Sequence, residues 1–133
     1  MVKLSALLFE LSSDERMRML MDLCVDKARL SHIAQKQDIT IAEASRHLQR
    51  LSEAELVSKN ADGLYLPTSY GKLVLSLLSG LNFVTENKAY FLEHNLSVLP
   101  IEFVDRIGEL GISSFRGDTI SNLAYEENMF VQA

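Results

Sequence analysis

The residues best suited to recognising another molecule lie together in the segment TIAEASRHLQRL, residues 40–51. At helical spacing, Ala44, Leu48 and Leu51 share one inward face, so the side chains between them point outward. The predicted outward row is Ala42, Ser45, Arg46, Gln49 and Arg50. Arginine, glutamine and serine on an exposed helix hydrogen-bond well to base edges and to phosphates. The segment therefore predicts a helix that reads a nucleic-acid groove, and the alternative is an amphipathic helix packed in a core.

If this helix enters a major groove, several of its side chains are predicted to contact base edges. Arg46 is able to donate two hydrogen bonds to a guanine, a contact worth about 1–3 kcal/mol of discrimination. Ile41 or Ala42 is placed to rest on a thymine methyl group. Ser45 and Gln49 are able to hydrogen-bond to bases or to phosphates.

Other residues are better placed for the phosphate backbone. Arg50 and Lys59, together with the amide of Asn60 in a predicted hairpin, are expected to make backbone contacts. Thr40 precedes the helix, whose first N–H groups offer a place for a phosphate. Ser31, at the start of the preceding helix, completes the predicted DNA-binding set.

Glu43 and His47 have structural alternatives to base contacts. Glu43 is able to accept a hydrogen bond from a cytosine amine, but Thr40 and Glu43 also have the spacing of a capping box, which favours a structural role. His47 falls beside the inward face, where a packed, hydrogen-bonded histidine is favoured over a base reader.

Two helices and a tight turn are predicted to position the row. In LSHIAQKQDIT, residues 30–40, Ser31 is the predicted N-cap of a helix that ends near Gln37. A turn follows at Asp38, because aspartate tolerates the left-handed conformation that tight turns often need. Thr40 then begins the outward-facing helix with Glu43 as its capping partner.

The segments on either side complete the outline. A short apolar helix over residues 5–13 precedes a second helix, which is predicted to start with a capping box at Ser12 and Glu15. Its predicted buried stripe is Met17, Leu20, Met21, Cys24 and Val25, with Cys24 as a buried apolar residue rather than a reactive thiol. The segment LVSKNADGLYLP, residues 56–67, is a predicted hairpin that turns at Gly63 and ends at Pro67. The fold class is therefore mainly α with a small β-hairpin, in a winged helix-turn-helix outline.

A long helix is predicted from Thr68 to about His94, followed by further short helices. Its seam alternates spacings of four and three residues, which is typical of coiled coils. The apolar seam positions are Tyr70, Val74, Leu77, Leu81, Val84 and Phe91, with Lys88 as the exception. We expect this seam to be the interface of a homodimer. A shorter helix is predicted from Pro100, with Ile101, Val104, Ile107 and Leu110 inward and Gly111 as its end, and a helical period recurs over 118–133.

Composition limits the function. The net charge of −5 argues against a non-specific polyanion binder. Any DNA contact is expected within residues 1–66, which carry nine basic against ten acidic residues. The single cysteine excludes an internal disulfide. The apolar stretch at 73–84 is too short and broken to span a bilayer, so we expect a cytoplasmic protein without a membrane partner. The predicted domains are 1–67 for DNA binding, 68–96 for dimerisation and 97–133 as a helical extension.

No residues predict catalysis or a metal site. His32, His47 and His94 lie far apart in the sequence, and the adjacent Glu93 and His94 cannot share a helical face. A glycine-rich phosphate loop, a nucleophile motif and a paired acid and base are all missing. We therefore expect no enzyme activity, metal or cofactor.

Residues 12–66 resemble the winged-helix domain of ArsR-type and related archaeal regulators. The segment LSSDERMRMLMDL resembles their first long helix, and LSHIAQKQDITIAEASRHLQRLSEAELV resembles their helix-turn-helix, with the frequent Ser-Arg-His-Leu-x-Arg-Leu pattern at residues 45–51. Asp38 and Glu55 depart from the pattern, because the family usually has glycine at both places. The segment FLEHNLSVLPIEFVDRIGEL, residues 91–110, resembles the linker of archaeal regulators first described as controllers of methanogenesis, in which a larger ligand-sensing domain follows.

The resemblance implies a cytoplasmic, sequence-specific transcriptional regulator that binds double-stranded DNA as a homodimer. Two reading helices about 34 Å apart would match a palindromic operator. The operator, the direction of regulation and any small-molecule effector are left open. The alternative is a winged helix used only for protein–protein contact, which the acidic composition and Glu43 favour.

Overall fold

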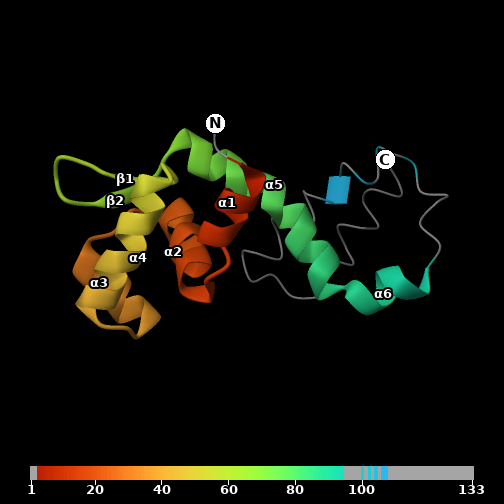
Figure 1. Ribbon diagram of the computed structural model, residues 1–133, viewed down its shortest axis with the longest axis horizontal. Coiled ribbons are helices and arrows are strands. Elements are labelled where there is room, and N and C mark those ends of the chain that lie inside the picture. Colours follow the sequence, from red (N-terminus) through yellow and green to blue (C-terminus); the bar gives the residue numbers. More distant parts are fainter. Residues whose placement is uncertain (1–2, 95–99, 101, 103, 105, 108–133) are drawn as a thin grey trace. The chain divides into compact units, whose positions relative to one another are not determined.

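The computed structural model describes residues 3–94, together with 100, 102, 104, 106 and 107 (Figure 1). The described chain is mainly helical with one small antiparallel sheet. It divides into two compact units, Met1–Leu73 and Val74–Ala133, and each is described by itself. The elements of the described residues are α1 (Leu4–Glu10), α2 (Asp14–Val25), α3 (Leu30–Gln37), α4 (Ile41–Glu53), β1 (Val57–Lys59), β2 (Tyr65–Pro67), α5 (Ser69–Glu86) and α6 (Lys88–Glu93).

Helix α2 begins one residue later than the sequence predicts. Its N-cap is Ser13, whose hydroxyl accepts a hydrogen bond from the backbone N–H of Arg16, whereas the hydroxyl of Ser12 donates to Phe9 O. The predicted buried stripe is also rotated. The buried residues are Arg16, Met19, Leu20 and Leu23. Val25, expected to be inward, is 81% exposed. The reason is Arg16, because a charged residue on the buried face shifts any stripe that is fitted to apolar residues alone.

Helices α3 and α4 are joined by a tight turn at Asp38, as the sequence predicts. Helix α3 starts after Arg29 with no side-chain cap, so the prediction that Ser31 is the N-cap is wrong, and Ser31 lies in the first turn. The capping box of α4 is confirmed: Thr40 Oγ1 accepts from the N–H of Glu43 at 3.1 Å, and Glu43 Oε2 accepts from the N–H of Thr40 at 3.3 Å. The predicted inward face of α4 is also confirmed, because Ala44, Leu48 and Leu51 are all fully buried.

Both helices end in the same kind of turn. The residues that end them, Asp38 and Glu55, have left-handed backbone with φ of 54° and 61°. In each case the next N–H reaches five residues back, from Ile39 to Ala34 O and from Leu56 to Leu51 O. This is the Schellman arrangement, in which glycine is usual because it adopts the left-handed conformation without steric cost.

The hairpin has the predicted position and turn. In its register Val57 pairs with Pro67 and Lys59 pairs with Tyr65, so β2 ends at Pro67 as predicted. The turn is closed by Asn60 Oδ1, which accepts from two backbone N–H groups, and by Gly63 at φ 80°. On the other edge of β2, Ala28 exchanges two backbone hydrogen bonds with Tyr65, so the segment before α3 is tied to the hairpin.

The core of the first unit lies between α2, α3, α4 and the hairpin. Its large, fully buried apolar residues are Met19, Leu20, Leu48, Leu51 and Leu56. The start of α5 approaches the backbone here, because a Cβ built on Gly71 would lie 2.1 Å from Leu56 O. Thr68 Oγ1 donates to Glu55 O at 2.6 Å and accepts from the N–H of Gly71 at 2.9 Å. Only glycine fits at position 71 without moving the backbone.

The single long helix expected from Thr68 to His94 is two helices. The break is at Asn87, whose backbone has φ −111° and ψ 31°. The side-chain Nδ2 of Asn87 donates to Phe83 O at 2.9 Å, alongside its own backbone N–H. A side chain that bonds locally to the backbone competes with continued helix, which explains the break.

The predicted seam is divided between exposed and packed residues. Tyr70, Leu77 and Leu81 are exposed, by 43%, 74% and 59%. Val74 is buried. Val84 and Phe91 pack in a cluster of the second unit around the buried Phe83 and Ile107. Half of the seam is therefore available to another molecule.

The predicted helix from Pro100 is partly described. Glu102, Val104, Arg106 and Ile107 are helical. Ile107 is buried as expected, but Val104 is 53% exposed, because it lies outside the cluster that covers Ile107. Ile101, Leu110, Gly111 and residues 118–133 fall outside the described residues. Over the part of the chain that is described, no helix has the length and apolar character needed to cross a membrane.

Candidate nucleic-acid interface

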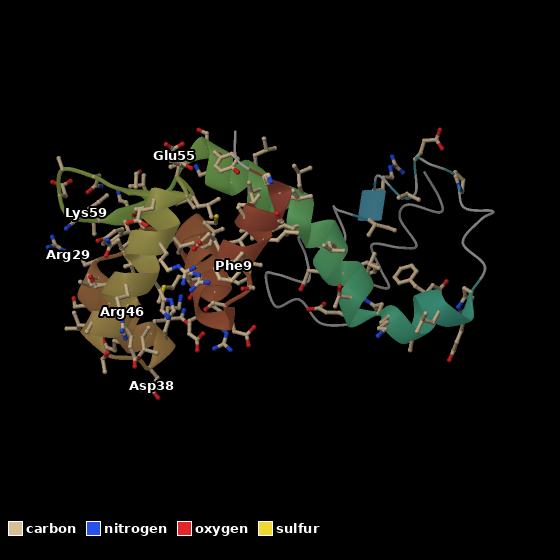
Figure 2. All side chains as sticks on the ribbon, in the orientation of Figure 1. Phe9, Arg29, Asp38, Arg46, Glu55 and Lys59 are labelled. Atoms are coloured by element: carbon tan, nitrogen blue, oxygen red, sulfur yellow. The ribbon has the colours of Figure 1, made fainter. Side chains whose placement is uncertain are left out.

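The N-terminal half of α4 presents the most accessible part of the predicted reading row. Ile41 is 57% exposed, and Ala42, Ser45 and Arg46 are exposed as well. Figure 2 labels Arg46 on α4. Among the described residues Arg46 has no hydrogen-bonding or ion-pair partner. This half of α4 therefore offers one unengaged guanidinium beside small and apolar side chains.

Farther along α4, the predicted row is engaged by the protein itself. Gln49 is exposed, but its Nε2 donates to Glu53 Oε1 at 3.2 Å. Arg50 forms two 3.0 Å hydrogen bonds to the two carboxylate oxygens of Glu10, and its guanidinium lies 5.3 Å from the ring centre of Phe9. Arg50 points outward as predicted, with its side chain 41% exposed, but it is paired with Glu10 at the end of α1.

This ion pair changes the acidity of both partners. Hydrogen bonding from Arg50 lowers the pKa of Glu10 below its usual value near 4.5, although slight burial opposes the effect. The same hydrogen bonds raise the pKa of Arg50. Both groups therefore stay charged at neutral pH, and the carboxylate neutralises one of the two arginines of the predicted row.

Arg16 is a buried neighbour of the predicted row that the sequence analysis did not single out. It is 6% exposed, and its guanidinium donates to the carbonyl oxygens of Phe9 and Glu10. Burial lowers the pKa of Arg16. Its Nη1 also lies 3.4 Å from His47 Nδ1, and since arginine only donates, this nitrogen is the acceptor. The half-buried His47 is thus packed and hydrogen-bonded, as predicted.

A usable signal for Arg16 was present in the sequence. It lies four residues before Leu20 and seven before Leu23, which is the spacing of one helical face. An arginine on such a face needs buried acceptors, and the exposed carbonyls at the end of a preceding helix are natural candidates. Those carbonyls belong to Phe9 and Glu10.

The hairpin contributes one exposed cation. Lys59 is exposed, and its Nζ lies 5.6 Å from the ring centre of Tyr65. The backbone N–H of Asn60 donates to Leu64 O at 2.9 Å, so that amide is used inside the turn. Thr40 uses its hydroxyl in the capping box, whereas Ser31 is exposed at the start of α3. Of the residues predicted to contact the phosphate backbone, the Asn60 amide is used inside the turn, whereas the side chain of Lys59 is exposed.

No family model, curated protein or solved structure matches the chain. The similarity to ArsR-type regulators therefore stays a prediction. Among the residues that the structure describes, no group of three or more histidine, cysteine, aspartate or glutamate side chains is arranged to hold a metal ion.

Proposed function

We propose that the chain is a winged helix-turn-helix transcriptional regulator of ArsR-like type that reads DNA with α4. One observation carries the proposal. On the N-terminal half of α4 the side chains of Ile41, Ala42, Ser45 and Arg46 are exposed, while the opposite face of the same helix is completely buried. A helix fixed in this way presents its exposed side chains at little entropic cost on binding. The turn at Asp38 and the hairpin at Val57–Pro67 are compatible with the turn and the wing of this fold and support the proposal.

In this proposal α4 lies in the major groove and its first turns face the base edges. Arg46 donates to a guanine, Ser45 hydrogen-bonds to a base or phosphate, and Ile41 or Ala42 contacts a thymine methyl group. Arg50 makes no DNA contact, because Glu10 holds it. The proposal involves no catalytic step and no cofactor, and its setting is the cytoplasm.

The proposed regulator is a homodimer through α5. The exposed face of this helix includes Tyr70, Leu73, Leu77 and Leu81, which a second copy would cover. Apolar side chains at such spacing match the partner side of a helix–helix contact. A twofold axis would place two α4 helices about 34 Å apart and would match a palindromic operator.

The test is selection of bound sequences from random duplex DNA, followed by binding measurements on the selected site. Arg46→Ala is expected to weaken binding to that site about 5–150-fold and to relax the preference at one base pair, the equivalent of a lost guanine contact. Arg18→Ala is the control, because Arg18 is an exposed arginine on α2. Failure of the wild-type chain to bind any duplex, even at low salt, would remove the proposal.

A second candidate is a winged helix that contacts only proteins. The exposed apolar residues of α1 favour it, because Leu4 and Phe9 are 69% and 62% exposed. The neutralised Arg50 favours it too, since it leaves fewer cations for phosphates. The selection experiment separates the two, because this candidate predicts no enriched DNA sequence.

A further inference from the structure

Arg29 occupies a position that the structure fixes on both sides. The preceding residue, Ala28, donates to Tyr65 O at 3.1 Å and accepts from the N–H of Tyr65 at 2.8 Å. Arg29 itself is extended, with φ −82° and ψ 156°, and its carbonyl accepts from the N–H of Ile33 at 3.0 Å. Its Cα is thus held between the edge of the hairpin and the first turn of α3.

The side chain of Arg29 is nevertheless free. It is exposed, and within the described residues no carboxylate, carbonyl or ring is in contact with its guanidinium. Three other cations of the first unit are engaged, whereas Arg46 is free like Arg29. Arg16 donates to backbone carbonyls, Arg50 is paired with Glu10, and Lys36 lies 3.6 Å from Asp22. A free arginine on a fixed backbone meets a ligand without first breaking an internal bond.

The hairpin brings Lys59 to the same edge. Lys59 pairs in register with Tyr65, and Ala28 pairs with Tyr65 from its other side. Two strand spacings therefore separate the backbones of Lys59 and Ala28, which amounts to about 10 Å. Figure 2 shows Arg29 and Lys59 projecting at the hairpin end of this unit, with Arg46 on the neighbouring α4.

We propose that Arg29 binds a backbone phosphate of the DNA whose groove receives α4, with Lys59 as its neighbour along the hairpin edge. The inference rests on the proposed function and adds a residue that the sequence did not indicate. Guanidinium groups bind phosphate oxygens in pairs, and such contacts position a protein on the duplex without selecting a sequence. Arg29 and Lys59 therefore supply affinity, whereas Arg46 supplies discrimination.

The test is the salt dependence of binding to the selected duplex and to an unrelated one. Each phosphate contact makes the slope of log K against log salt more negative by about 0.9. Between about 50 and 200 mM salt, the affinity of Arg29→Ala for DNA should therefore fall by a factor roughly 3.5 times smaller than the factor for wild type. At low salt, Arg29→Ala should bind more weakly than wild type, and by the same factor for the selected and the unrelated duplex. Arg29→Lys keeps the charge and should keep the wild-type slope.

Arg18→Ala is the matched control. Arg18 is an exposed arginine on α2, which packs against α4, and it lies on the side of α2 opposite to the buried residues. Its removal should leave the slope unchanged. If the wild-type protein binds DNA and Arg29→Ala has the wild-type salt slope, this inference is overturned but the proposed function is not. A wild-type protein that binds neither duplex would overturn the proposed function, and this inference with it.

Discussion

Two arginines on α4 show how environment decides what a side chain does. Arg46 and Arg50 are one helical turn apart and look equivalent in the sequence. Arg46 has no partner among the described residues, whereas Arg50 is bound by Glu10 and lies over Phe9. Glu10 is 40 residues away along the chain, so no local pattern reveals the pairing. The sequence therefore predicted that both arginines point outward, but it did not reveal that Arg50 has an acidic partner.

The Glu10–Arg50 pair should make stability depend on pH in acid. Because the folded-state pKa of Glu10 is lowered, its carboxylate stabilises the fold above the usual pKa near 4.5, and this stabilisation is lost as the pH falls through the lowered pKa. Glu10→Gln should therefore be less stable than wild type at pH 7, and the difference should shrink below pH 4.5. Urea unfolding of both proteins across this range measures it. A difference that is constant with pH would contradict the ionic origin.

Arg16 should contribute stability through its hydrogen bonds rather than through its charge alone. Arg16→Met keeps an unbranched apolar stem but leaves the carbonyls of Phe9 and Glu10 without these donors, so we expect a loss of about 1–3 kcal/mol. Arg18→Met, on the exposed side of the same helix, should change stability by less than about 0.5 kcal/mol. Denaturant unfolding compares the two. Equal effects would mean that the Arg16 contacts are not stabilising.

At the scale of helices and turns, local sequence signals were predictive where a single residue was available to make the cap or the turn. Thr40 and Glu43 make the predicted capping box, and the hairpin turns at Gly63. Errors arose where neighbouring residues compete for a role. Ser12 and Ser13 are both able to cap α2, and the hydrogen bond of Ser12 to Phe9 O leaves the cap to Ser13. The break at Asn87 was missed for a similar reason, because its side-chain bond to Phe83 O is not visible in an apolar pattern.

Replacing the residue with left-handed backbone that follows α4 should stabilise the protein. Glu55 has φ 61°, a conformation that costs a residue with a Cβ more than it costs glycine. Glu55→Gly should raise the free energy of unfolding by about 0.5–1 kcal/mol, since greater freedom in the unfolded chain offsets part of the relieved strain. Thermal or denaturant unfolding measures the change.

The same substitution inside the helix is the control. Glu53→Gly, at the end of α4, should lower stability, because glycine is a poor helix former. If Glu55→Gly lowered stability as Glu53→Gly does, the turn at Glu55 would not be strained.

At the scale of the whole molecule, assembly was the hardest feature to predict. A seam fitted to seven positions treats them alike, but Val84 and Phe91 are used within the second unit, and Tyr70, Leu77 and Leu81 are exposed. The pattern of a helix cannot distinguish a face covered by its own chain from one covered by a second copy. The proposed homodimer therefore depends on the exposed half of the seam.

Leu77 tests that dimer directly. It is 74% exposed, so Leu77→Lys should leave the folded chain intact but place a charge in the interface. Sedimentation should show a wild-type dimer and a monomeric variant at micromolar concentration. Leu92→Lys is the matched control, because Leu92 is 75% exposed on α6 and lies outside the predicted seam. A monomeric wild-type chain, or an equal response to both substitutions, would contradict dimerisation through α5.

The neutralisation of Arg50 by Glu10 has a consequence for how a DNA-reading protein of this kind would find its target. Long-lived sliding along unrelated duplex needs many cations facing the phosphates. Here one of the two arginines on α4 already has an acidic partner within the protein, and the whole chain is acidic. Such a protein would leave unrelated sequence quickly and would reach its operator mainly through repeated short encounters from solution.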